Sequence, residues 1–154
     1  MSQSVAYYKN LYLDGQSLKG FTTDPVTDTC QLVTAGGSQF TQTGSEFHWQ
    51  KVGQWIHFEG FAVWVALPAV AGPVYLVPPQ ALIDVYPLKD NVLCHIQGDH
   101  LPTANQKTMY MVTDELEQAF ILEITTEGVV PQPVISSQFN VAGIVQFSGR
   151  YRTF

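Results

Sequence analysis

The run KVGQWIHFEGFAVWVALP, at residues 51–68, constrains the fold more than any other part of the chain. Every second residue from Ile56 to Trp64 is apolar or glycine, which predicts a strand with that side on a hydrophobic core. The opposite side begins polar and becomes apolar toward Val65, so we expect a loop or another chain to cover its far end. The side chains expected at such an interface are Trp55, Phe61, Val63 and Val65.

Similar alternation recurs in residues 46–50, 118–125 and 144–152. Turn signals rich in glycine, proline and asparagine separate such segments at intervals of roughly ten residues, which is typical of an all-β sandwich or jelly roll. We therefore predict an antiparallel β-sandwich over residues 30–154. Further strands are expected at residues 31–34, 38–42, 74–77, 92–97 and 108–112.

Helix signals are weak throughout the sequence. The best candidate is the short segment from Thr113 to Gln118, which is too short to be stable alone. Five prolines between residues 68 and 87 confine that section to sheet edges and loops, because proline cannot donate a hydrogen bond to a neighbouring strand. We expect no helix longer than two turns.

Residues 1–29 differ in composition from the rest of the chain. An aromatic-rich start, which contains Tyr7, Tyr8 and Tyr12, leads into an irregular connector. Two interpretations stay open: an N-terminal arm that lies on a neighbouring subunit, or a first edge strand. In the first interpretation the three tyrosines are interface residues.

Composition excludes several classes of function. The formal charge is −6 and only Arg150 and Arg152 lie close together, so the chain lacks the many clustered lysines and arginines that binding of nucleic acid requires. Polar and charged residues interrupt the apolar run at 51–68, so no window of about 18 apolar residues could span a bilayer. No secretory signal is recognisable, and Cys30 and Cys94 are expected to be buried free thiols.

Two segments resemble each other. Residues 53–61 and 143–151 both begin with glycine and later contain phenylalanine, one residue and a second glycine; four residues precede the phenylalanine in the first segment and three in the second. Phenylalanine and glycine two positions apart lie on the same face of a strand. The glycine then leaves room for a large ring from a neighbouring strand, or permits a kink.

Catalytic and metal-binding signals are absent from the sequence. Cys94 and His95 point to opposite faces of a strand and cannot hold one metal ion together, although a turn at Gly98 could gather His95 with Asp99 and His100. Glu59 and Glu123 are the only acids worth testing as a glycosidase pair. We predict no catalytic residue, no metal, no cofactor and no enzyme activity.

Two short motifs resemble those of tailed-bacteriophage virion proteins. Residues 49–53 (Trp-Gln-Lys-Val-Gly), followed by Phe58-Glu59-Gly60, resemble a turn and strand of fibre-tip and decoration-type β-domains. Residues 147–153 are similar to the closing strand of tail-fibre domains. The resemblance covers about a fifth of the chain, and the shaft repeat of a complete tail fibre is missing.

The resemblance implies a non-enzymatic structural protein of the virion that assembles in the host cytoplasm. It favours a capsid decoration (cement) protein that contacts the major capsid protein, with a receptor-binding tail fibre or tail tip as the alternative. It also implies a homo-oligomer, with a trimer expected and a dimer as the alternative. The low share of charged residues, 13%, supports assembly because a monomer rarely exposes a large apolar patch.

Overall fold

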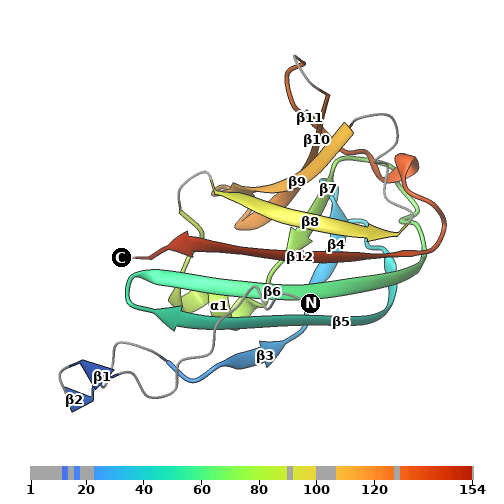
Figure 1. Cartoon of the computed structure of the whole chain (residues 1–154). Helices are drawn as coiled ribbons and strands as arrows, with labels where there is room; N and C mark the ends of the chain where they lie inside the picture. Colours follow the sequence, from blue (N-terminus) through green and yellow to red (C-terminus); the bar gives the residue numbers. More distant parts are fainter. Residues whose placement is uncertain are drawn as a thin grey trace.

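The computed structural model describes residues 12–13, 16–17, 23–89, 92–99, 107–126 and 129–153, and almost all of the regular structure in them is β-strand (Figure 1). One short α-helix and one 3-10 turn interrupt the strands. The elements are β1 (Tyr12–Leu13), β2 (Gln16–Ser17), β3 (Val26–Asp28), β4 (Gln31–Thr34), β5 (Thr41–Val52), β6 (Trp55–Ala66), β7 (Val74–Val77), α1 (Gln80–Val85), β8 (Leu93–Asp99), β9 (Lys107–Asp114), β10 (Ala119–Thr126), β11 (Gln132–Pro133), η1 (Ser136–Gln138) and β12 (Gly143–Arg152).

Most strands belong to one continuous antiparallel sheet. Its order is β3-β5-β6-β12-β8-β9-β10-β7-β4, and β11 pairs with β10 outside this path. β1 and β2 form a separate two-stranded pair. β3 lies at one end of the strand order and pairs with β5. The predicted boundary between an N-terminal segment (residues 1–29) and the β-domain (residues 30–154) stays a prediction.

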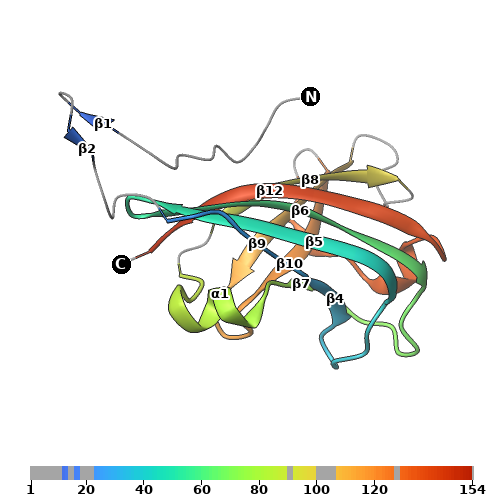
Figure 2. The same cartoon turned by 90° about the horizontal axis from the view of Figure 1, so that it is seen from below.

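The sheet curls into a half-barrel, so that its two arms face each other across the core (Figure 2). Three strands separate β6 from β10 in the sheet order, yet the rings of Phe58 and Phe120 lie 4.9 Å apart between centroids. The arms join where β8 pairs with β9 over only three residue pairs. The predicted all-β antiparallel fold is confirmed, whereas a sandwich of two separate sheets or a jelly roll is not.

Side chains bridge the gap between β4 and the first half of β5. The Gln42 Oε1 atom accepts a hydrogen bond from the Leu32 backbone N–H at 2.5 Å, and its Nε2 donates to the Cys30 carbonyl oxygen at 3.1 Å. Ser45 Oγ accepts a hydrogen bond from the Cys30 N–H at 3.2 Å. These polar side chains satisfy backbone groups of Cys30 and Leu32 that no strand pairs within the described residues.

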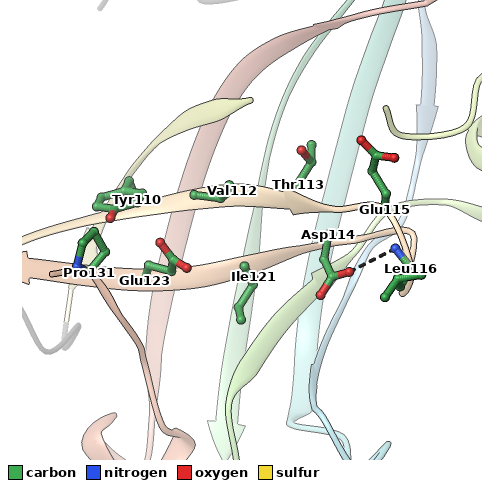
Figure 3. Close-up of a pocket in the computed structure, with 9 residues that line it drawn as sticks. All are labelled: Tyr110, Val112, Thr113, Asp114, Glu115, Leu116, Ile121, Glu123 and Pro131. Atoms are coloured by element: carbon green, nitrogen blue, oxygen red, sulfur yellow. Dashed lines mark hydrogen bonds between the residues drawn. The ribbon is translucent and has the colours of Figure 1, made fainter. Parts of the chain in front are cut away.

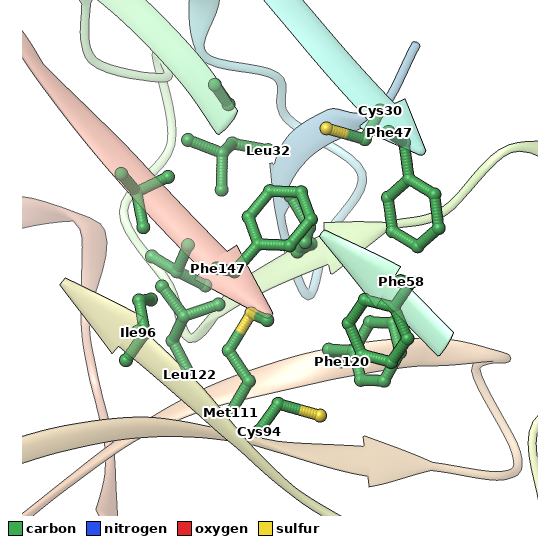
Figure 4. Close-up of a cluster of buried hydrophobic side chains, with 14 of the residues drawn as sticks. Cys30, Leu32, Phe47, Phe58, Cys94, Ile96, Met111, Phe120, Leu122 and Phe147 are labelled. Atoms are coloured by element: carbon green, nitrogen blue, oxygen red, sulfur yellow. The ribbon is translucent and has the colours of Figure 1, made fainter. Parts of the chain in front are cut away.

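The alternation in β6 agrees with the prediction. Its apolar side packs into the core, and Ile56, Phe58, Ala62 and Trp64 have no exposed surface. Burying each such side chain contributes roughly 1.5–3 kcal/mol. The core continues onto the other arm through residues such as Met111, Phe120 and Leu122 (Figure 4).

The two Phe-x-Gly segments pair with each other. In the register of β6 and β12, Phe58 lies opposite Gly149, and Phe147 lies opposite Gly60. A Cβ atom on Gly149 would lie 2.9 Å from Phe58 Cζ, and one on Gly60 would lie 2.8 Å from Phe147 Cζ. Each glycine therefore leaves the space that the opposite ring occupies, as the sequence predicted.

The predicted helical segment at 113–118 is instead the turn between β9 and β10. Asp114 Oδ1 accepts hydrogen bonds from the N–H groups of Leu116 (3.1 Å) and Glu117 (3.2 Å), as a helix-capping residue does, but Gln118 adopts a positive φ and the chain enters β10 at Ala119. The α-helix lies at Gln80–Val85, directly after two prolines, and its Leu82 and Ile83 are buried. It is shorter than two turns, and no helix in the described part of the chain is long and apolar enough to cross a membrane.

Both cysteines are buried free thiols, as predicted. Figure 4 shows them at different edges of the phenylalanine cluster. Burial raises the pKa of each thiol to about 12, and a hydrogen bond from Ser45 offsets part of the effect at Cys30.

Candidate functional site: a groove and a basic patch

A shallow groove of about 660 Å³ lies on the outer face of the β9–β10 hairpin (Figure 3). The inner side chains of these strands, such as Met111 and Leu122, are buried in the core, so mainly outer side chains line the groove, together with the buried Thr113. The lining residues are Tyr110, Val112, Thr113, Asp114, Glu115, Leu116, Ile121, Glu123 and Pro131.

The groove has an apolar middle and an acidic group at each end. Val112 and Ile121 face each other in the strand register and form the middle. Glu123 lies opposite Tyr110 at one end, and Asp114 begins the turn at the other end. Loss of solvation raises the pKa of Tyr110, and its hydrogen bond to Glu123 raises it further.

The turn that closes the groove is held by Gln118. This residue adopts φ of 52°, a left-handed conformation that is uncommon outside glycine. Its Nε2 donates to the carbonyl oxygens of Leu88 (3.1 Å) and Glu115 (2.7 Å), while its Oε1 accepts from the Leu88 N–H (2.7 Å). The two bonds to Leu88 tie this end of the groove to the segment after α1, and the bond to Glu115 lies within the turn.

A second surface lies on the outer face of β6 and β12, on the other arm of the sheet. The Arg150 guanidinium carbon lies 4.7 Å from the centre of the Trp55 ring, within the range of a cation–π contact. Arg152, directly opposite Trp55, donates to Gln54 Oε1 from Nε (3.1 Å) and Nη2 (2.8 Å). We call Trp55, Arg150 and Arg152 the basic patch.

His57 lies opposite Arg150 in the strand register, next to the basic patch. Partial burial lowers its pKa, and the positive charge of Arg150 lowers it further. His57 is therefore mainly neutral at pH 7, and the two arginines supply the positive charge of this surface.

The predicted interface residues of β6 share one outer face. Trp55 is 37% exposed and Val65 is 45% exposed, while Phe61 and Val63 are half-buried. Ile144 lies opposite Val63 and extends this apolar end, although the sequence analysis did not single it out. We call Phe61, Val63, Val65 and Ile144 the apolar strip.

The role of these residues in an interface stays a prediction. The described part of the chain does not include Tyr7 and Tyr8, and it gives only the backbone of Tyr12, which pairs with Ser17.

Among the residues that the structure describes, the candidate metal and catalytic side chains do not come together. Cys94 is buried and His95 is exposed, so they point to opposite faces as expected, while the side chains of Asp99 and His100 lie outside the described residues. Within the described ranges, no group of three or more potential ligands could hold a metal ion. Glu59 and Glu123 lie on the outer faces of opposite arms, because β6 and β10 face each other across the core, so they cannot flank one substrate.

No family model and no curated protein matches the chain. Among solved structures, the chain is similar to "Crystal structure of Dettilon tailspike protein (gp208)", with a TM-score of 0.61 and 11% sequence identity. The match covers 82% of this chain and 23% of the tailspike chain, so this chain spans less than a quarter of the length of that protein. At this identity the likeness concerns the fold: the curled sheet resembles one part of a phage tailspike.

Proposed function

We propose that this chain is a structural β-domain of a tailed-phage virion and that it functions through contacts with other protein chains. The observation that carries the proposal is the fold likeness to part of a tailspike over 82% of the chain. The two motifs that resemble virion β-domains, at 49–60 and 147–153, lie on β5, β6 and β12 in the same arm of the sheet. The sequence and the fold thus support the same class of protein independently.

A position in the tail is the first candidate, because the similar structure is a tailspike. Decoration of the capsid, which the sequence analysis favoured, is the second candidate. It is supported by the apolar strip, where Val65 is 45% exposed, because such a surface suits stable contact with another protein. In both candidates the chain forms a homo-oligomer, with a trimer expected.

Receptor recognition and catalysis are less well supported than assembly. Among the groove residues that the structure describes, Tyr110 is the one aromatic side chain, so the groove offers no cluster of rings on which a glycan could stack. The two acids considered for glycoside hydrolysis face away from each other. We therefore propose a non-enzymatic role.

Immunogold electron microscopy of purified phage particles tests this function. An antibody raised against the purified chain should label intact virions, and mass spectrometry should detect the chain in them. Label at the tail supports the first candidate, and label spread over the head supports the second. Absence of the chain from purified virions would contradict both.

A further inference from the structure

The groove and the basic patch are complementary in both charge and polarity. The groove presents apolar side chains between two acidic ends, and the basic patch presents an indole ring flanked by two guanidinium groups. Tryptophan and arginine are the residues most enriched at the energetic centres of protein interfaces. The planar guanidinium group also suits paired hydrogen bonds to a carboxylate.

The basic patch stands out against the charge of the whole chain. The formal charge is −6, so two copies repel each other on average and need a local attraction to associate. Arg150 and Arg152 supply positive charge on one arm, while Asp114, Glu115 and Glu123 supply negative charge on the other. Because the two surfaces lie on different arms, one copy can present its patch while its groove is occupied by another copy.

We propose that the basic patch of one copy binds the β9–β10 groove of a second copy, head to tail. Trp55 occupies the apolar middle over Val112 and Ile121. Arg150 and Arg152 pair with the acids at the ends of the groove. This inference rests on the assembly part of the proposed function and assigns the surfaces that assembly uses.

A head-to-tail contact also determines what kinds of oligomer can form. Contacts between two different surfaces of identical chains close into rings or extend as filaments, depending on the rotation between neighbours. A three-copy ring is the closed form that agrees with the expected trimer. The apolar strip, at the other end of β6, then remains for contact with another virion protein.

Mixing two charge-reversal variants tests the proposal. Arg150→Glu removes a functional patch, and Glu123→Arg removes a functional groove, so each variant alone should associate at least about a hundredfold more weakly than the original chain. In an equal mixture, the intact patch of the Glu123→Arg chain binds the intact groove of the Arg150→Glu chain. The reversed charges of the two variants also attract each other, so size-exclusion chromatography with light scattering should show species of at least twice the 17.1 kDa chain mass, which neither variant forms alone.

Three controls keep the test specific. Asp24→Arg makes the same charge change as Glu123→Arg at an exposed position outside the groove, and should leave association unchanged. Trp55→Ala should weaken association at least about tenfold, whereas Val65→Ala, on the apolar strip, should not. Circular dichroism establishes that each variant is folded.

The outcomes separate the proposal from its alternatives. An original chain that stays monomeric at low salt and high concentration overturns it. Association that persists in both charge-reversal variants also overturns the proposal. So does association that is lost in Val65→Ala but kept in Trp55→Ala, because another surface then mediates assembly. The position of the chain in virions is measured separately, so failure here removes the assembly part of the proposed function and leaves its place in the virion standing.

Discussion

Phe58 on β6 lies opposite Gly149 on β12, and its ring occupies the space where a side chain at position 149 would begin. The same relationship holds between Phe147 and Gly60. The Phe58 and Phe147 rings lie 6.4 Å apart between centroids, on the buried side of β6 and β12. The pairing of the two segments therefore sets the register of β6 and β12.

The first prediction concerns these glycines. Gly149→Ala should lower the free energy of unfolding by about 1–3 kcal/mol, because the new methyl group crowds Phe58 and the buried Cys94. Gly60→Ala should cost more, since its methyl group would also meet the backbone carbonyl of Glu46, which cannot move without disturbing the sheet. Urea unfolding measures both changes.

Gly36→Ala is the matched control, because no atom lies within 4 Å of a Cβ built there. It should change the free energy of unfolding by less than about 1 kcal/mol. Equal stability of the Gly36, Gly60 and Gly149 variants would contradict the pairing of the two segments.

The second prediction concerns Gln118 in the turn between β9 and β10. Gln118→Ala loses the bonds to Leu88 and Glu115 but keeps the left-handed backbone, so it should cost about 1–3 kcal/mol. Gln118→Gly loses the same bonds but relieves the backbone strain, and should be more stable than the alanine variant by roughly 1 kcal/mol. Thermal unfolding of the two variants gives the comparison; an alanine variant at least as stable as the glycine variant would show that the turn is not strained.

The third prediction concerns pH. Cys30 and Cys94 have an ordinary pKa of 9.0 in the unfolded chain and about 12 in the folded chain. Between pH 9 and 12 the unfolded chain has lost thiol protons that the folded chain retains, so stability falls as pH rises. Each thiol contributes a slope of at most roughly 1.4 kcal/mol per pH unit.

Urea unfolding at a series of pH values measures this slope. Cys94→Ala should have a shallower slope than the original chain, and the difference isolates the thiol from the tyrosines and lysines that titrate in the same range. At pH 8 the folded chain should resist alkylation by iodoacetamide, and the urea-unfolded chain should react. Rapid labelling of the folded chain would contradict the burial of both thiols.

The sequence predicts the strands well but not the way they close into a sheet. Alternation in β6 reports which side of a strand is buried, because burial depends on every second residue. It does not report whether the opposite wall of the core belongs to a second sheet or to the same one. In this chain the two arms belong to one sheet because β8 and β9 pair over three residue pairs around Cys94. The residues of these pairs show no distinctive sequence pattern.

The helix and the groove show two further limits. The helix α1 follows two prolines and packs two buried side chains, Leu82 and Ile83, against the core. A segment of this length has too few residues to show the hydrophobic periodicity that predicts a helix. The groove lies on the outer sides of β9 and β10, where the sequence drew attention to Glu123 alone and not to a groove. Tyr110, Val112 and Asp114 alternate on the outer side of β9, and this pattern was the available signal.

The fourth prediction, assembly, is the central claim, and sedimentation velocity of the unmodified chain tests it most directly. We expect a species of three times the 17.1 kDa chain mass at micromolar concentration and low salt. Because arginine–carboxylate pairs contribute to the contact, that species should dissociate as the salt concentration rises. A single 17.1 kDa species at all concentrations and salt conditions would contradict the claim that this chain assembles with copies of itself.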